Sequence, residues 1–188
     1  MSTSETYKIS LFNKALHDRS AFSCGLEGID NWLKNSISDQ IKENRLRVYC
    51  AVDDNGRVVG FYALNAHSVR PEEAPALAKK GERHEIPAIY LPSIGVDSSC
   101  QGNGLGSALM AHAIRKSVEA ADQIGAAAII LDVKRDDNLD RRMKFYTDLG
   151  FQLLGGSAEL RVFLSMKAAR LSVEQMKAAQ AASLALIK

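Results

Sequence analysis

The sequence contains no long apolar run. Its longest runs are residues 126–131 and 184–187, far shorter than the roughly 18–20 residues that a membrane-spanning helix needs. The first ten residues also lack the charged-then-apolar pattern of a secretory signal peptide. We therefore expect a protein that does not enter a membrane.

Cysteine is scarce as well. The three cysteines, Cys24, Cys50 and Cys100, are odd in number and far apart, which argues against a disulfide framework and for the reducing cytoplasm. No cysteine pair has metal-ligand spacing, and the four histidines form no motif. The sequence therefore predicts a cytoplasmic protein without a metal site.

A large excess of charge is also missing. The 24 Lys and Arg nearly balance the 22 Asp and Glu, which leaves a formal net charge of +2. With 46% hydrophobic residues, 13 Gly and 4 Pro, the composition excludes a disordered or low-complexity chain. A length of 188 residues suits one domain. Nucleic-acid binding would need a local basic surface.

The clearest helical pattern lies near the start of the chain. Apolar residues recur there every four positions, at Ile29, Leu33, Ile37 and Ile41. This spacing predicts a helix over residues 28–43 with one apolar face. We expect Trp32 to pack in the core beside it.

Strand and turn patterns fill much of the remaining sequence. A strand is expected to begin within residues 8–15, and a hairpin turn is expected at Asn55-Gly56. Residues 68–87 read as a loop with a short helix, and residues 88–96 as a strand interrupted by Pro92. Further strands are predicted at residues 47–52, 58–63, 126–133, 151–154 and 159–166, with a turn at 155–157. Further helices are predicted from the 97–106 segment to Gly125, at 139–149 and at 171–187. The alternation favours one α/β or α+β domain with a mixed sheet.

The most informative segment is SIGVDSSCQGNGLGSAL, residues 93–109. A strand ends there, glycines alternate at Gly102, Gly104 and Gly106, and a helix begins. Glycines let a backbone approach a ligand closely, and a helix N-terminus offers free N–H groups and partial positive charge, which suit a pyrophosphate. The spacing differs from the dinucleotide-binding and P-loop motifs. A glycine-rich turn without a ligand remains open at this point.

Two motifs resemble those of the GNAT acetyltransferase superfamily. The run Gln101-Gly102-Asn103-Gly104-Leu105-Gly106 matches its acyl-CoA-binding pattern, (Gln/Arg)-x-x-Gly-x-(Gly/Ala). Downstream, KFYTDLGF at residues 144–151 looks like its second signature, a tyrosine helix that leads to Gly-Phe. The resemblance covers roughly residues 47–166. It implies a GNAT fold, with one mixed, mostly antiparallel central sheet flanked by helices and a splayed acyl-CoA cleft.

A narrower resemblance links the chain to the GNAT toxins of bacterial toxin–antitoxin pairs. It rests on FSCG at residues 22–25, DNWLK at 30–34, GFYAL at 60–64 and RVFLSMK at 161–167. It implies acetylation of the α-amino group of aminoacyl-tRNA, neutralisation by a ribbon-helix-helix antitoxin, and a homodimer. The chain departs from the family pattern at Ser93, where an arginine is usual.

The resemblance also implies site residues. Tyr146 is the expected general acid, and a backbone N–H near Val96 would stabilise the oxyanion. The residues expected to bind acetyl-CoA, the acyl donor, are Ile94, Gly95, Val96, Gln101, Gly102, Asn103, Gly104, Leu105, Gly106 and Asn138. Cys100 is expected to be a small residue in a tight turn. The domain is expected to span residues 1–167, with residues 168–188 as its C-terminal helical extension.

Two other functions remain open from the sequence. One is a GNAT enzyme that acetylates a small amine or a protein amine, and the other is a non-catalytic partner-binding protein that retains the CoA fold. A tRNA substrate would need basic contacts. The candidates are Lys42, Arg45 and Arg47, and then Lys134, Arg135, Arg141, Arg142 and Lys144, which alternate with acidic residues.

Overall fold

The computed structural model describes residues 7–156 and 158–185. The chain divides into two compact units. The first contains the chain up to Asn65 together with Leu91–Ala113, and the second contains Ala66–Tyr90 and the chain from Ile114 onward. Strand β3 (Val58–Val69) and helix α3 (Leu105–Ile124) run through both units.

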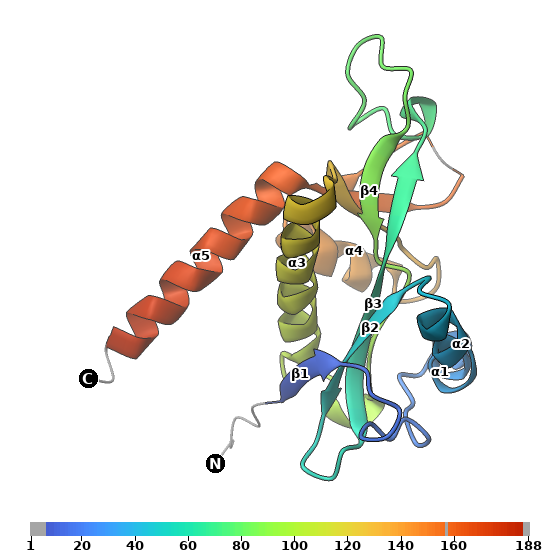
Figure 1. Ribbon diagram of the computed structural model, residues 1–188, viewed down its shortest axis with the longest axis vertical. Helices are drawn as coiled ribbons and strands as arrows, with labels where there is room; N and C mark the ends of the chain where they lie inside the picture. The colour runs from blue at the N-terminus through green and yellow to red at the C-terminus, as the bar shows by residue number, and fades with distance from the viewer. Residues whose placement is uncertain (1–6, 157, 186–188) are drawn as a thin grey trace. The chain divides into compact units, whose positions relative to one another are not determined.

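The first unit is built on an antiparallel sheet. Strand β1 (Lys8–Leu11) pairs with β2 (Arg47–Val52), and β2 pairs with β3. Helices α1 (Glu27–Asn31) and α2 (Ile37–Lys42) lie beside this sheet (Figure 1). The Asn-Gly turn of the β2–β3 hairpin is confirmed, because Gly56 has a φ of 78° and its N–H donates to the Asp53 carbonyl at 3.0 Å.

The predicted helix over residues 28–43 is helical throughout but is not one α-helix. A π-helical turn, Trp32–Ser36, separates α1 from α2. In an α-helix a four-residue spacing turns the apolar positions by about 40° per step. The wider π turn counteracts this drift. Leu33 and Ile37 are consequently fully buried, and Trp32 packs partly buried against the same core, as expected.

Pro92 divides the predicted strand over residues 88–96 into two strands with different partners. Strand β4 (Ile86–Tyr90) pairs in parallel with β6 (Ala128–Asp132). Strand β5 (Ile94–Val96) pairs antiparallel with β3. A proline cannot donate to a ladder, so the prediction that it interrupts the strand is confirmed. The division places β5 in the first unit and β4 in the second.

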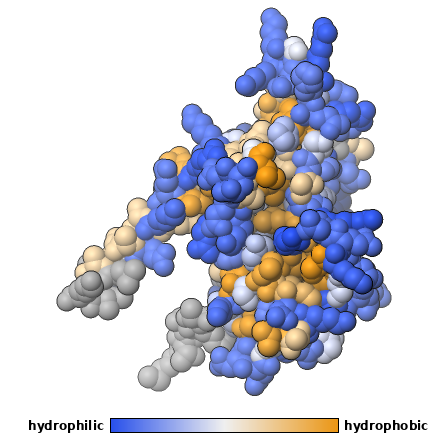
Figure 2. Space-filling model, viewed as in Figure 1, coloured by the Kyte–Doolittle hydropathy of each residue, from blue (hydrophilic) through white to orange (hydrophobic). Residues whose placement is uncertain are grey.

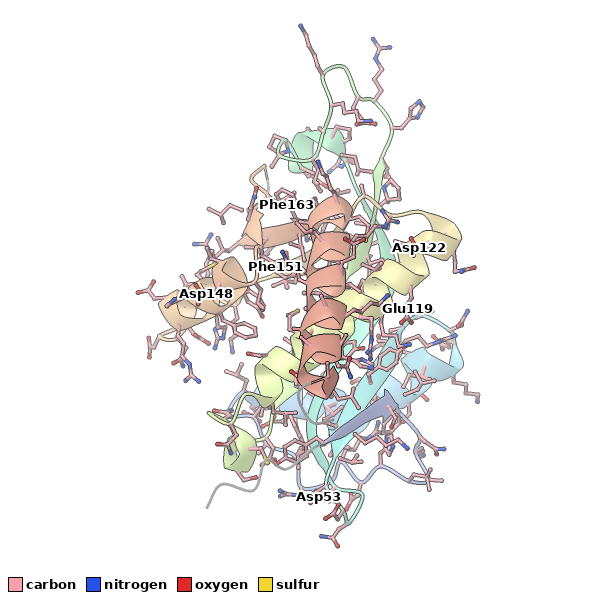
Figure 3. The ribbon with its side chains drawn as sticks, turned by 90° about the vertical axis from the view of Figure 1, so that its left-hand side faces the viewer. Asp53, Glu119, Asp122, Asp148, Phe151 and Phe163 are labelled. Atoms are coloured by element: carbon pink, nitrogen blue, oxygen red, sulfur yellow. The ribbon has the colours of Figure 1, made fainter. Side chains whose placement is uncertain are left out.

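The second unit joins parallel and antiparallel strands. Strand β6 lies between β4 and β8 (Arg161–Ser165), and β8 also pairs antiparallel with β7 (Gln152–Leu153). A 3-10 turn, Pro71–Glu73, follows β3. Helix α4 (Leu139–Asp148) connects β6 to β7. Helix α5 (Met166–Ala185) follows β8, and its Arg170 forms an ion pair of 2.6 Å with Asp122 of α3, labelled in Figure 3.

The predicted fold class is confirmed. Neighbouring strands form an eight-stranded mixed sheet in the order β1-β2-β3-β4-β6-β8-β7, with β5 paired to β3. Among the strand pairs described above, β4 and β6 are parallel and the others are antiparallel. The last helix begins at Met166 instead of at residue 171. Residues 186–187 of that predicted helix, and Ser157 of the predicted turn, lie outside the described residues. No helix in the described part of the chain is long and apolar enough to cross a membrane.

Candidate functional site

Strand β5 directs part of its backbone away from β3. The Ser93 carbonyl accepts from the Ala63 N–H at 2.9 Å, and the Asp97 N–H donates to the Val59 carbonyl at 2.8 Å. Because such bonds alternate along an antiparallel ladder, residues 93, 95 and 97 face β3. The N–H and carbonyl groups of Ile94 and Val96 therefore point to the opposite edge. Among the described strands β5 pairs with β3 alone.

A short polar network fixes the turn that follows β5. Asp97 precedes the 3-10 turn Ser98–Cys100 and accepts from the Ser99 N–H at 3.1 Å and the Ser23 N–H at 3.0 Å. Burial favours the neutral acid, but the hydrogen bonds from Ser99 and Ser23 lower the pKa of Asp97 below its usual value. An ionised Asp97 therefore holds the turn against residue 23. Cys100 is buried in this turn, where a small residue was expected.

The side chain of Gln101 braces the same corner. Its Nε2 donates to the Val96 carbonyl at 3.0 Å and to the Cys24 carbonyl at 3.1 Å. The second bond reaches a residue far away in the sequence. Gln101 therefore joins the end of β5 to the segment before α1, and it fixes where the following loop begins.

The loop after Gln101 presents a run of free backbone donors. Within the described residues, none of the hydrogen bonds is donated by the backbone N–H groups of residues 101–107, and the first N–H donated into α3 is that of Ala108, to the Gly104 carbonyl at 3.1 Å. The N-terminus of this helix adds partial positive charge. Residues 101–104 are exposed. The corner therefore offers a run of free backbone donors of the kind that binds a diphosphate.

The glycines of this corner serve two different purposes. Gly102 and Gly104 both have a φ of +81°, and an added Cβ at either would contact nothing within 4 Å. Their role is conformational, because other residues rarely adopt this φ. Gly95 has a packing role instead, since an added Cβ would lie 3.1 Å from the Phe61 ring. Gly106 has neither requirement, because its added Cβ would only touch Val96 at 3.8 Å.

Helix α3 is held on the face of β3 opposite Phe61. An added Cβ at Gly60 would lie 2.8 Å from Leu109 of α3, so the helix packs directly on this glycine. The Tyr62 hydroxyl and His112 Nδ1 are 2.6 Å apart, and Tyr62 is fully buried. These contacts fix the first turns of α3, and hence the direction of its free N–H groups.

Tyr146 lies in the second unit, near the C-terminal end of α4. It is 7% exposed, with its ring packed edge-on against Phe151, labelled in Figure 3, at a centroid distance of 5.9 Å. Burial raises the pKa of the Tyr146 phenol, and Arg142 opposes this in part. The phenol is therefore protonated at neutral pH, as a proton donor must be.

The loop before α4 is fixed by an ion pair. Arg142 donates to both carboxylate oxygens of Asp136, at 2.7 and 2.8 Å, and to the Lys134 carbonyl at 3.0 Å. Asn138 is the residue before α4, but its side chain makes no capping hydrogen bond and is exposed. The structure therefore shows no local role for the Asn138 side chain.

The two predicted basic clusters are partly neutralised. In the first, Arg45 pairs with Glu43 at 2.8 Å. In the second, Arg142 pairs with Asp136 and Lys144 with Asp148. Lys134, Arg135 and Arg141 are exposed, and the described residues form no ion pair with them. In the first cluster, Lys42 and Arg47 likewise form no ion pair with the described residues, so positive charge remains at both clusters.

Sequence reasoning missed the residues that support the corner. It did not predict the Ser23–Asp97 bond, the bracing by Gln101, or the contact between Tyr62 and His112. Only Asp97 had a usable signal, because Asp followed by two serines is typical of a capped turn. No group of three or more metal-ligating side chains occurs in residues 7–156 and 158–185.

Comparison with known proteins gives the family. Residues 14–151 match the acetyltransferase (GNAT) family. A probable toxin TacT of Sinorhizobium fredii is 38% identical over 160 residues, 82% of this chain and 88% of that protein. A tRNA-acetylating toxin of Mycobacterium tuberculosis is 36% identical over 155 residues, 81% of this chain and 89% of that protein.

Solved structures agree with this assignment. AtaT complexed with acetyl-methionyl-tRNAfMet has a TM-score of 0.78 and 26% identity, and the match covers 88% of this chain and 98% of that one. A tyrosine-to-phenylalanine variant of AtaT, bound to acetyl-CoA and the C-terminus of the antitoxin AtaR, has a TM-score of 0.72 and 25% identity, with 88% and 96% covered. The chain thus belongs to the acetyltransferase (GNAT) family, among the acetyl-CoA-dependent GNAT toxins.

Proposed function

We propose that this protein transfers an acetyl group from acetyl-CoA to the α-amino group of aminoacyl-tRNA and thereby blocks translation. The observation that carries the proposal is the donor-lined corner at residues 101–107, in a chain that is 36% identical to a tRNA-acetylating toxin. Acetylation of the amine removes the nucleophile that peptide-bond formation needs. A charged tRNA treated in this way cannot extend a peptide.

The residues of the first unit fit the acyl donor, which supplies an activated acetyl thioester when bound. The N–H groups of residues 101–107 would hold its diphosphate, and Gly102 and Gly104 provide the positive φ that this loop needs. The outward edge of Ile94 and Val96 would pair with its amide-containing arm, as an added strand does. The Val96 carbonyl is already bonded to Gln101, so both groups of Ile94 remain for this pairing, and the Val96 N–H is left for the reacting carbonyl.

The same edge supplies a donor for the reacting carbonyl. We assign the Val96 N–H as the group that stabilises the oxyanion formed when the amine attacks. Tyr146 is assigned as the general acid that protonates the departing thiolate. Its raised pKa keeps the phenol protonated over the working pH range. No residue is assigned as base, because an α-amine loses its proton to water more readily than a lysine does.

The tRNA would be recognised through its phosphates. Lys134, Arg135 and Arg141 are exposed around the start of α4, in the same unit as Tyr146. Phosphate contacts of this kind supply affinity and position without reading sequence. Binding should therefore weaken steeply with salt.

Partners follow from the relatives. AtaT binds the C-terminus of an antitoxin, and we propose that this chain also has an antitoxin, with a ribbon-helix-helix DNA-binding part. We propose a homodimer and a cytoplasmic location, where acetyl-CoA and charged tRNA occur together. Helix α5 presents both hydrophobic and hydrophilic residues on its surface (Figure 2). Its Leu171 is 56% exposed and its Met176 is 36% exposed.

The test is transfer of label from acetyl-CoA to bulk charged tRNA. The wild-type chain should label charged tRNA and leave deacylated tRNA unlabelled, because only the charged form carries an α-amine. Tyr146→Phe should bind acetyl-CoA and label the charged tRNA much more slowly. Equal labelling of deacylated tRNA, or labelling of added proteins alone, would refute the proposed substrate.

A further inference from the structure

Two buried oxygen atoms of the first unit have no hydrogen-bond partner among the described residues. They are Oδ1 of Asn65 and Oγ of Ser93. Buried polar atoms are nearly always paired, so an unpartnered pair on neighbouring strands needs an explanation. Neither atom takes part in the network of Asp97, Ser99 and Gln101 described above.

Both side chains lie on the same face of the sheet. An added Cβ at Gly95 would contact Phe61, Phe22 and Ile29. Since side chains alternate between faces along a strand, Ser93 shares this face with the Cβ position of Gly95. Asn65 shares it with Phe61. The two oxygens therefore belong to the face covered by Phe22 and α1, and α3 packs on the other face.

The ladder brings the two residues close together. Ala63 and Ser93 are opposite each other, because the Ala63 N–H donates to the Ser93 carbonyl at 2.9 Å. Asn65 is two residues further along β3 and is thus the diagonal neighbour of Ser93. Diagonal neighbours in an antiparallel pair are about 7–8 Å apart at Cα. Two side chains at this spacing on one face are close enough to direct their oxygens toward one small group between them.

Ser93 also adjoins the outward edge of β5. The next residue, Ile94, directs its backbone away from β3, and this is the edge at which the acyl donor is proposed to pair. A nucleophile held by Ser93 and Asn65 would therefore approach that edge from the face opposite α3. The acyl donor and the nucleophile would then reach the edge of β5 from different directions, as a transfer between two substrates requires.

We propose that Asn65 and Ser93 bind the acceptor amine. This inference rests on the proposed function and identifies the residues that receive its acceptor. An α-amine carries N–H donors that match two oxygen acceptors. Both oxygens are uncharged, so they hold the amine without favouring its protonated form as a carboxylate would. The attacking amine must be neutral, and this pair of residues accommodates it in that state.

The experiment compares variants of the full chain with bulk charged tRNA as acceptor. Ser93→Ala and Asn65→Leu should each lower kcat/KM for charged tRNA by about three- to tenfold, with the Kd for acetyl-CoA unchanged. Their melting temperatures should stay the same or rise, because each substitution removes a buried oxygen that forms no hydrogen bond in the folded protein. The exposed residues Ser183 and Asn55 give matched controls, and Ser183→Ala and Asn55→Ala should match the wild type.

A further variant tests contact with the amine itself. Asn65→Asp keeps the size of the side chain but adds negative charge, which favours the ammonium form. The rise of kcat with pH should therefore move to higher pH than in the wild type. A purely structural role for Asn65 would leave this profile unmoved.

The outcomes separate this inference from the proposed function. If the wild type acetylates charged tRNA and the alanine, leucine and aspartate variants behave like it, the acceptor-binding role is wrong and the proposed function stands. If the wild type does not acetylate charged tRNA, the proposed function fails and this inference fails with it. Loss of melting temperature in Ser93→Ala and Asn65→Leu, together with an unmoved pH profile in Asn65→Asp, would also overturn the inference.

Discussion

Gly104→Ala tests whether the backbone of the 101–107 corner binds the acyl donor. Gly104 has a φ of +81°, and an added Cβ would contact nothing within 4 Å. The substitution therefore introduces backbone strain without a clash. A non-glycine residue in this conformation costs about 1–2 kcal/mol. Because nothing packs against the exposed position, the free loop can relax, and the cost should appear when the donor binds.

The expected result is a Kd for acetyl-CoA that rises about 5- to 30-fold, measured by calorimetry. Gly81→Ala provides the matched control. Gly81 has a φ of +79° and equally open surroundings, but it lies in a loop to which no role is assigned. That variant should bind acetyl-CoA like the wild type. If Gly104→Ala also binds like the wild type, the backbone of this loop does not hold the donor and the reasoning is refuted.

Three further predictions follow from the same contacts. Tyr146→Phe should keep acetyl-CoA affinity and lower turnover. In the wild type, the phenol of Tyr146 should keep its proton between pH 7 and about 9, because burial raises its pKa, so turnover should not fall in this range for lack of that proton. Gln101→Ala should weaken acetyl-CoA binding in calorimetry by about three- to tenfold, because the Val96 and Cys24 carbonyls lose their common donor. Asp97→Asn should lower stability at pH 7 but reduce its loss in acid, measured by urea unfolding at pH 3 and pH 7.

The sign for Asp97 follows from its hydrogen bonds. Burial alone would raise the pKa of Asp97, but the bonds from Ser99 and Ser23 outweigh it and lower the pKa in the folded state. Such a carboxylate contributes its full stabilisation at pH values above the pKa that an aspartate has in the unfolded chain, near 3.9. This stabilisation disappears as the pH falls through the lower, folded pKa. An asparagine does not titrate, so an equally steep acid loss in Asp97→Asn would contradict the assignment.

Local patterns were sufficient for most of the elements. Gly125 ends α3 as expected, with a φ of 76°, because a helix C-terminus and its glycine lie within a few residues of each other. The π-helical turn at Trp32–Ser36 could not be predicted, although the strict four-residue spacing of Leu33 and Ile37 hinted at it. Whether a helical turn widens in this way depends on the position of the core against which its apolar face packs, and a local sequence pattern does not contain that position.

The sequence predicted the parts of the candidate site that depend on backbone conformation, but not the parts that depend on contacts between distant residues. Gly102 and Gly104 carry their conformational requirement in the sequence itself. The roles of Gln101 and Ser93 depend on Cys24 and Asn65, which are distant in sequence. Gly95 was expected to bind the coenzyme, and its packing against Phe61 became visible only in three dimensions. Nothing in a local pattern shows which strand lies opposite β5.

The central claim is tested most directly by the mass of the 3′-terminal nucleoside of charged tRNA. The tRNA is treated with acetyl-CoA and the wild-type chain, digested with ribonuclease, and analysed by mass spectrometry. The account predicts an aminoacyl-adenosine that carries one acetyl group on its α-nitrogen. An unmodified aminoacyl-adenosine, or an acetyl group found only on other nucleosides, would contradict it.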